Sequence, residues 1–226
     1  MLELKHISKR FEEHLIIDDV SLVLPDCGTV GIQGTSGCGK STLLYIIGML
    51  DDDFEGEIFY NGEKVTDRSE FISQNISYMM QNKDFISALT IKENITLASQ
   101  VSQFDYSPAI LQKITTQLSI QDLLKRYPHQ LSGGQLKRAS IAKAMLKQSP
   151  IILCDEPTGA LDSNTSRDIL VLLEQINQKY GTTMLIVTHN NSIKNMVHQV
   201  IRIKDGMIRE CYENETRVPA AELEDL

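Results

Sequence analysis

One segment of the chain has the residue types and spacing of a phosphate-binding loop. Residues 34–42 read GTSGCGKST and satisfy the pattern G-x-x-x-x-G-K-[ST]. The glycines of such a loop let the backbone turn so that successive N–H groups point at one anion. Lys40 would then reach the β- and γ-phosphates of a nucleotide, and Ser41 would offer its hydroxyl to Mg²⁺. The nucleotide-binding residues predicted from this loop are Gly34, Thr35, Ser36, Gly37, Cys38, Gly39, Lys40, Ser41 and Thr42.

The residues on either side of the loop favour this interpretation. Apolar-leaning residues 30–33 can form a buried strand, and Leu43, Leu44, Ile46 and Ile47 continue as a helix after Ser41. The bare pattern also occurs in unrelated chains as a Gly/Ser-rich turn before a helix. The strand and the helix are the context that the motif requires, so we favour nucleotide binding.

Two adjacent carboxylates follow a second buried strand. Residues 151–154 are continuously apolar and end in Asp155 and Glu156, as expected for a strand of a parallel sheet. Ligands of doubly wound sheets sit at the carboxyl ends of the strands. Asp155 could hold the Mg²⁺ shell, and Glu156 could polarise a water that attacks the γ-phosphorus. A lone Asp-Glu pair often only terminates a strand, but beside a phosphate loop the catalytic interpretation is favoured.

Three further side chains are candidates for the same site. Gln81 follows the predicted strand 76–79 and could touch Mg²⁺ as a neutral ligand, although a glutamine here is most often an ordinary loop residue. His189 follows the predicted strand 183–187 at the catalytic edge, where we expect it to contact the γ-phosphate. Phe11 could stack on a nucleotide base or pack in the core, and its residue type does not decide between them.

The stretch 90–147 has helical periodicity. Thr90 with Glu93 predicts a capping box, and Ser107 before Pro108 predicts a second helix start. Ser132, Gly133 and Gly134 open a third helix, whose free N–H groups and positive dipole end form a second potential phosphate site.

The remaining segments frame these elements. Residues 2–7 and 16–24 alternate as strands of an antiparallel flank, and residues 57–60 enter a hairpin at Asn61-Gly62. Residues 163–179 predict an amphipathic helix closed by Gly181, and 200–209 predict a closing hairpin. Residues 213–226 are acidic and lack periodicity, so we expect a loosely ordered tail.

Composition limits the function classes. The chain has 226 residues, with 22 Lys and Arg against 30 Asp and Glu, a net charge of −8 that argues against nucleic acid as a partner. Its apolar runs are too short to cross a bilayer, and the first residues do not resemble a signal peptide. The four cysteines show neither CxxC pairs nor zinc spacing, which indicates reduced thiols in packing roles.

Taken in order, these motifs resemble those of the ATP-binding cassette ATPases. Residues 34–42 are similar to the Walker A motif of that family, Gln81 to its Q-loop, LSGGQ at 131–135 to its signature, and 151–156 to its Walker B motif. Residues 160–162 resemble the D-loop, and His189 resembles the switch histidine. Phe11 stands where tyrosine is more frequent, Cys38 where serine is common, Met80 where an aromatic is frequent, and Leu136-Lys137 where glutamine is usual.

The resemblance implies an α/β fold of the P-loop NTPase (RecA-like) type over residues 2–226. The nucleotide-binding core would comprise 1–81 and 151–212 with an antiparallel β flank, the inserted α-helical signature subdomain 82–150, and the acidic tail 213–226. The family also implies ATP and Mg²⁺ as cofactors. Glu156 and His189 would be catalytic, Ser41, Gln81 and Asp155 would serve the metal, and Phe11 would stack on adenine.

The family further implies a head-to-tail homodimer. Each ATP would lie between one copy's Walker A loop and the signature residues of the other copy, Ser132, Gly133, Gly134 and Gln135. A separate integral-membrane permease would hold the protein at the inner face of the cell membrane, in a groove near 81–90 with Phe85 and Leu89 as candidate contacts. The residues that follow both Walker motifs are similar to those of the subgroup serving macrolide export, lipoprotein release, and bacteriocin or antimicrobial-peptide export.

Other functions remain open. The same ATPase could regulate cell-wall hydrolases or division through a permease-like partner without transport. A cassette protein of DNA repair or of ribosomes is disfavoured, because those generally carry two cassettes or long coiled-coil insertions. A noncatalytic nucleotide sensor is disfavoured by the presence of both Glu156 and His189.

Overall fold

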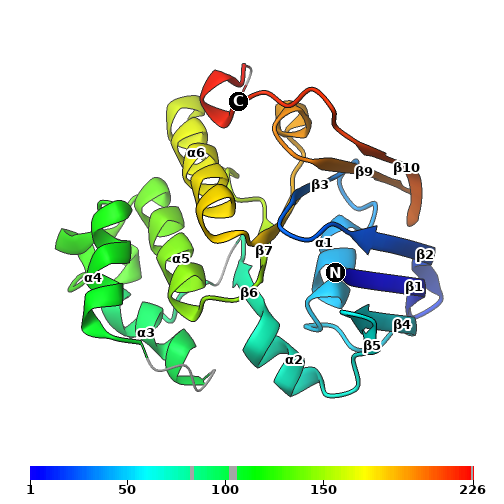
Figure 1. Cartoon of the computed structure of the whole chain (residues 1–226), viewed down its shortest axis with the longest axis horizontal. Coiled ribbons are helices and arrows are strands. Elements are labelled where there is room, and N and C mark those ends of the chain that lie inside the picture. The colour runs from blue at the N-terminus through cyan, green and yellow to red at the C-terminus, as the bar shows by residue number, and fades with distance from the viewer. Residues whose placement is uncertain (82–83, 102–105, 225) are drawn as a thin grey trace.

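The computed structural model describes residues 1–81, 84–101, 106–224 and 226, and it contains two sheets and a group of helices (Figure 1). The antiparallel sheet has the strand order β2-β1-β4-β5, and the six-stranded sheet has the order β10-β9-β3-β8-β7-β6. The first comprises β1 (Leu2–Phe11), β2 (His14–Leu24), β4 (Glu55–Tyr60) and β5 (Glu63–Lys64). The second comprises β3 (Thr29–Gln33), β6 (Ile76–Met79), β7 (Ile151–Asp155), β8 (Thr183–Val187), β9 (Gln199–Lys204) and β10 (Met207–Glu213).

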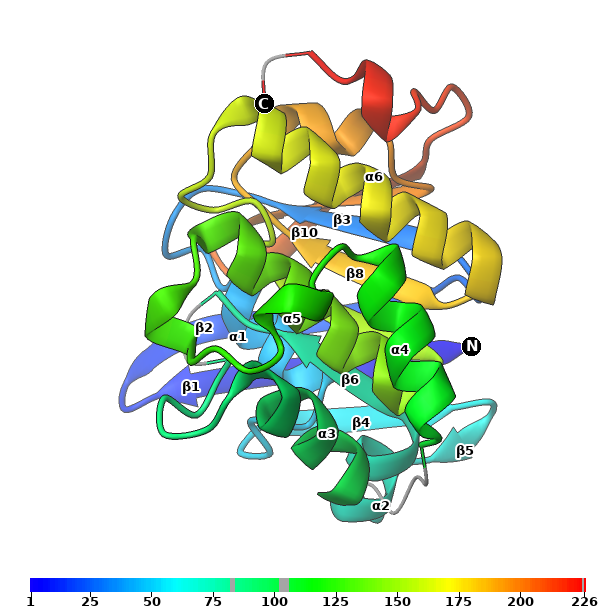
Figure 2. The same cartoon turned by 90° about the vertical axis from the view of Figure 1, so that its left-hand side faces the viewer.

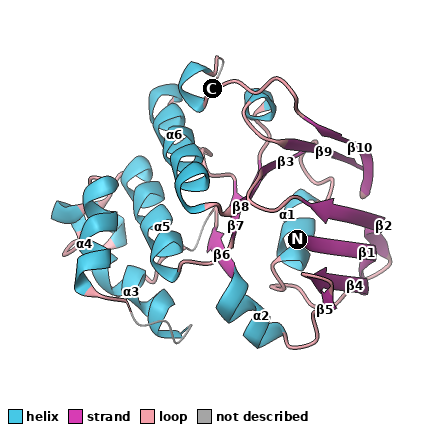
Figure 3. Ribbon diagram, in the orientation of Figure 1, coloured by secondary structure: helices cyan, strands magenta, loops and turns pink. Residues whose placement is uncertain are grey.

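The helices are distributed unevenly around the sheets, as Figure 3 shows. Their bounds are α1 (Lys40–Ile47), α2 (Arg68–Asn75), α3 (Ile91–Val101), α4 (Pro108–Gln117), α5 (Gly133–Lys147) and α6 (Ser163–Tyr180). Short 3-10 turns lie at η1 (Gln121–Leu123), η2 (Pro128–Gln130), η3 (Asn191–Asn195) and η4 (Ala220–Glu222). Helices α3, α4 and α5 form a group beyond the six-stranded sheet, seen in Figure 2 in front of the strands.

Parallel pairing brings the predicted site residues to one edge. β6, β7, β8, β3 and β9 are parallel neighbours, and β10 pairs antiparallel with β9 at the edge of the six-stranded sheet. Gln81, Glu156 and His189 each follow the carboxyl end of one of these strands, and the phosphate loop follows β3. The expected α/β fold with an antiparallel flank is confirmed.

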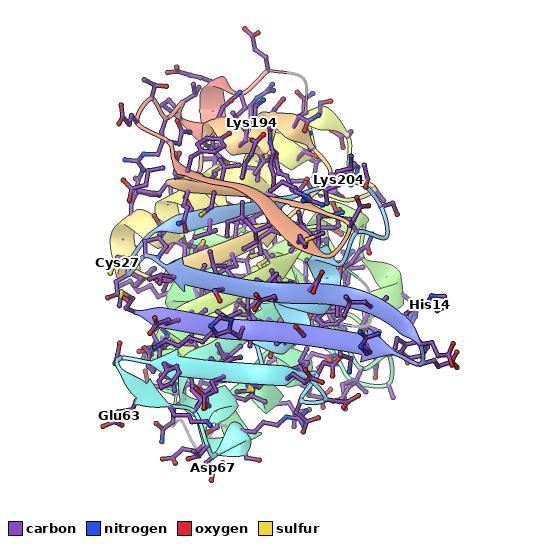
Figure 4. The ribbon with its side chains drawn as sticks, turned by 90° about the vertical axis from the view of Figure 1, so that its right-hand side faces the viewer. His14, Cys27, Glu63, Asp67, Lys194 and Lys204 are labelled. Carbon is purple, nitrogen blue, oxygen red and sulfur yellow. The ribbon has the colours of Figure 1, made fainter. Side chains whose placement is uncertain are left out.

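Helix α1 connects the two sheets through its apolar side chains. Leu43, Leu44, Ile46 and Ile47 are buried in a cluster with residues of β1, β2, β3 and β7. A second cluster joins α3, α4, α5 and α6 to the other face of the parallel strands. Figure 4 shows the antiparallel sheet from its outer side, with His14 at one end and Cys27 at the other.

The predicted caps form. Thr90 N donates to Glu93 Oε2 over 2.7 Å, and Glu93 N donates to Thr90 Oγ1 over 3.3 Å. Ser107 and Ser132 cap α4 and α5 through their hydroxyls. These bonds satisfy N–H groups that a helix start otherwise leaves without partners.

One helix was not predicted from the sequence, and the tail differs from expectation. Helix α2 lacks an apolar periodicity, and it is fixed by an Asp67 side-chain cap and by a single buried residue, Phe71. The tail is not loosely ordered where the structure describes it: Ala220 and Leu223 are buried against α6, and Arg167 Nη2 donates to Leu223 O over 2.9 Å. The acidic composition conceals these apolar anchors. Among the described residues, no helix has the length and apolar character needed to span a bilayer.

Candidate functional site

A cavity of about 620 Å³ lies at the carboxyl edge of the parallel strands. It collects most of the predicted site residues, which come from the phosphate loop, from β1 and from the ends of β6, β7 and β8. Its lining includes Phe11, Ser36, Gly37, Gly39, Lys40, Ser41, Thr42, Gln81, Glu156 and His189, together with Lys9, Ile16 and Asp51.

The phosphate loop has the strained geometry that its glycines allow. Gly37 and Gly39 have φ angles of 78° and 102°, values that side chains rarely permit. A Cβ on Gly39 would lie 2.9 Å from Ile16 O, so the loop packs closely on β2. Lys40 Nζ donates to Gly34 O and Thr35 O over 2.9 and 2.8 Å, which holds its ammonium over the loop.

Not every loop residue faces the cavity. Cys38 is buried, and a Cβ on Gly34 would lie 2.5 Å from Cys38 Sγ and 2.3 Å from Ile203 O. Gly34 and Thr35 line a neighbouring cavity beside β9 and β10. Gly34, Thr35 and Cys38 can therefore contribute to nucleotide binding through the backbone conformation of the loop and not by lining the cavity.

Oxygen donors suited to a hard cation meet next to the loop. Ser41 Oγ donates to Asp155 Oδ1 over 3.1 Å, and the Tyr45 hydroxyl donates to Asp155 Oδ2 over 3.0 Å. Burial beside the Asp155 carboxylate raises the pKa of Tyr45, which keeps it a neutral donor. A hydroxyl and a carboxylate next to a phosphate pocket fit the ligand preference of Mg²⁺, whose other positions are commonly filled by phosphate oxygens and water. Gln81 shares the cavity, but no hydrogen bond joins it to Ser41 or Asp155 in the described part of the chain.

Glu156 and His189 face each other at the cavity. Glu156 Oε1 and His189 Nδ1 are 3.0 Å apart, with the carboxylate largely buried and the imidazole exposed. The second oxygen, Glu156 Oε2, is buried and has no hydrogen-bond partner among the described residues. Such an oxygen carries a desolvation cost unless a ligand or water accepts or donates a hydrogen bond there. An unsatisfied buried oxygen of this kind is typical of a binding or catalytic site.

The end of the cavity at Phe11, where we expect the nucleotide base, is open to solvent. Phe11 at the end of β1 is 67% exposed, so the structure places it outside the core. Lys9, two residues earlier on the same face of β1, is buried, and its Nζ lies 2.9 Å from Asp51 Oδ1 and 3.0 Å from Asp53 Oδ2. These hydrogen bonds, that to Asp51 first, raise the pKa of Lys9 and keep it charged.

The signature residues do not reach this cavity. Ser132 and Gly133 are exposed, and none of the residues 132–135 lines the cavity. The Ser132 hydroxyl accepts from Gln135 N over 3.3 Å, and Gln135 Oε1 accepts from Ser132 N over 3.0 Å. A single chain therefore presents the two predicted phosphate-binding segments in separate places.

Several residues around the site had no sequence signal. Tyr45 lies one helical turn after Ser41, and Lys9 lies two residues before Phe11, but neither spacing indicates a partner. Lys137 Nζ donates to Met80 O over 3.4 Å and to Glu156 O over 3.2 Å, so α5 contacts the backbone at Glu156 and at the residue before Gln81. Burial lowers the pKa of Lys137.

The fold and the cavity together define a P-loop nucleotide hydrolase. Residues 17–159 match the family model described as ABC transporter. The chain is 36% identical over 186 residues to the bacitracin export ATP-binding protein BceA of Halalkalibacterium halodurans, covering 79% of this chain and 74% of that protein. It is 34% identical over 234 residues to the methionine import ATP-binding protein MetN of Haemophilus ducreyi, covering 96% and 68%.

A solved structure is similar over nearly the whole chain. It is the dimeric post-hydrolysis state of the ATP-binding cassette MJ0796 bound to ADP and Pi, with a TM-score of 0.85, 33% identity, and coverage of 95% of this chain and 99% of that one. This chain belongs to the ABC transporter family, as an ATP-binding and ATP-hydrolysing cassette.

Proposed function

We propose that two copies of this chain bind two ATP molecules between them and hydrolyse them to drive a separate membrane permease. We infer the dimer from the separation of the two predicted phosphate-binding segments. Lys40 and Ser41 line the cavity, whereas Ser132 and Gly133 are exposed at the start of α5. A second copy, placed head to tail, supplies the missing segment, and the dimeric state of the similar MJ0796 cassette supports this arrangement.

The roles of the side chains follow from their positions. Loop N–H groups and Lys40 bind the β- and γ-phosphates, and Phe11 stacks on the base from the exposed end of β1. Ser41 and Asp155 hold Mg²⁺, with Gln81 approaching from the end of β6. When bound, the metal neutralises charge on the phosphate oxygens.

Hydrolysis uses the carboxylate next to the histidine. A water attacks the γ-phosphorus in line with the β–γ bridging oxygen, and the bond to that oxygen breaks to leave ADP and phosphate. Glu156 Oε2 accepts a proton from the water, because it is the oxygen without a partner. His189 holds Oε1 and keeps the carboxylate aimed at the γ-phosphate, which the histidine also contacts.

A mixing experiment tests the shared sites. Ser132→Arg leaves Lys40 intact, and Lys40→Ala leaves Ser132 intact. Neither variant alone is expected to trap nucleotide, whereas their mixture regains one composite site and traps about one ATP per pair. No regain in the mixture, with both variants folded, would contradict the shared site.

The permease and the cargo are the finer parts of the proposal. We infer export or extraction of a peptide, lipoprotein or antimicrobial, with the protein held at the inner face of the membrane by the permease. The resemblance of the segments after the Walker motifs supports this, as does the name of the bacitracin export relative; the methionine import relative shows that such similarity extends to importers. Regulation of cell-wall hydrolases without transport is the second candidate, supported by the same resemblance.

Isolation from host membranes tests these finer parts. The expected partner is a multispanning protein that co-purifies with the chain and raises its ATPase rate, and that moves cargo across reconstituted vesicles. A partner that activates wall hydrolases but moves no cargo would favour the second candidate. The predicted permease groove near 81–90 includes residues 82–83, which lie outside the described residues.

A further inference from the structure

The backbone of Glu156 has an unusual conformation. Its φ angle is 49°, in the left-handed region that residues with a side chain rarely adopt. Glu156 N donates to Val187 O over 2.9 Å, and Glu156 O accepts from Gly159 N over 3.1 Å. A conformation of this kind persists only where the surrounding structure holds it, and it is common at functional sites. The direction of the Glu156 carboxylate therefore depends on the contacts of its backbone.

Lys137 of α5 makes a further contact with this backbone. Its Nζ donates to Glu156 O over 3.2 Å and to Met80 O over 3.4 Å. Because Met80 precedes Gln81, one ammonium group joins the backbone next to Gln81 to that of Glu156. Among the described residues Lys137 forms no ion pair, so these two carbonyls are the contacts that hold its ammonium. Hydrogen bonds from a charged donor are stronger than those between neutral groups.

A second lysine of the same helix makes similar contacts away from the site. Lys147 Nζ donates to Ile72 O over 2.7 Å and to Ile76 O, at the end of α2 and the start of β6. Lys137 and Lys147 are both half-buried, and burial lowers the pKa of each. Neither carbonyl bound by Lys147 belongs to a residue that lines the nucleotide cavity, whereas Glu156 does line it. Lys147 is therefore a natural reference for a lysine that only fastens α5.

We propose that Lys137 is a positioning residue for hydrolysis. Its ammonium holds the left-handed backbone of Glu156, so that the carboxylate stays aimed at the γ-phosphate. Lys137 does not line the nucleotide cavity, and it acts on the reaction only through Glu156. This inference rests on the proposed catalytic role of Glu156.

Matched substitutions separate positioning from fastening of the helix. Lys137→Met removes the ammonium with little change in side-chain volume, and Lys147→Met does the same at the reference position. Lys137→Arg keeps the charge and the donors. Denaturant unfolding shows that each variant is folded, and Lys137→Leu replaces Lys137→Met in every comparison if the methionine variant does not fold. ATPase kinetics and calorimetry then give kcat, KM and ATP affinity.

The expected result is a loss of kcat without a loss of binding. Lys137→Met should lower kcat at least about tenfold and leave KM and ATP affinity within about threefold of wild type, because the phosphate loop is unchanged. Lys147→Met should keep kcat within about twofold, and Lys137→Arg should recover most of the rate that Lys137→Met loses. Wild-type kcat in the folded Lys137→Met or Lys137→Leu chain would overturn the inference, as would an equal loss in Lys147→Met.

A double-variant comparison asks whether the effect passes through Glu156. In single-turnover assays of the Glu156→Gln chain, adding Lys137→Met should change the residual rate by less than about twofold, because no base remains to be positioned. The same fold loss in both backgrounds would overturn the inference and leave the catalytic role of Glu156 standing. Hydrolysis by Glu156→Gln at the wild-type rate would overturn that role, and the inference with it.

Discussion

Glu156 Oε1 lies 3.0 Å from His189 Nδ1 at the nucleotide cavity. Glu156 follows β7, and His189 follows the neighbouring strand β8. His189→Ala removes the group that orients the carboxylate, and we expect the ATPase kcat to fall about 100-fold. ATP affinity, measured by calorimetry, should stay within about threefold of wild type. His14→Ala, an exposed residue at the β1–β2 turn, is the control. An unchanged kcat would exclude His189 from the catalytic geometry.

Lys40 binds nucleotide through its charge. Its Nζ already lies over the loop, held by Gly34 O and Thr35 O. Lys40→Ala should lower ATP affinity by about 10- to 100-fold, because charge-assisted bonds to phosphate are among the strong ones. Calorimetry with the exposed Lys92→Ala as control measures this, and equal affinities would count against the loop as the phosphate site.

Phe11 is placed for stacking and not for the core, because it is 67% exposed on the cavity rim. Phe11→Ala should raise the KM for ATP by about 3- to 10-fold with little loss of stability, and Phe11→Tyr should restore wild-type KM, since stacking geometry is worth about 1 kcal/mol. A large fall in unfolding free energy with unchanged KM would instead show a packing role.

Lys147 predicts a pH dependence of stability. Its folded pKa of about 8 lies below the usual value of 10.5, so the unfolded chain binds more protons between these values. The contribution of Lys147 to the free energy of unfolding therefore rises from about pH 8 to pH 10.5 and is lowest below pH 8. Relative to Lys147→Met, the wild-type protein should gain about 1 to 3 kcal/mol between pH 7 and pH 10. Chemical denaturation of both proteins at several pH values checks this, and parallel curves would contradict it.

The sequence predicted the buried strands that end at the site and the helix starts, because apolar runs and helix caps are local signals. It placed 76–79, 151–154 and 183–187 correctly as strands, with residues 81, 156 and 189 following their respective ends. Helix α2 escaped because its residues are mostly polar and only Phe71 is buried. The described tail escaped because Ala220 and Leu223 gain their meaning only against α6.

Contacts between distant segments were beyond the sequence. The bond from Tyr45 to Asp155 joins residues 110 apart, and the contact of Lys137 with Glu156 O depends on how α5 packs on β7. Neither partner follows from a local pattern. The signature loop had a local signal, because its helix start was predicted as a phosphate site. Its position could not be predicted, and the structure shows it exposed and separate from the cavity.

Glu156→Gln tests the shared-site mechanism most directly. The amide keeps the shape of the side chain and loses the base, so ATP should bind, kcat should fall at least about 100-fold, and the protein should sediment as a dimer only with MgATP. The double variant with Ser132→Arg should stay monomeric under the same conditions. A Glu156→Gln protein that binds ATP and remains a monomer, or that releases phosphate at the wild-type rate, would contradict the mechanism.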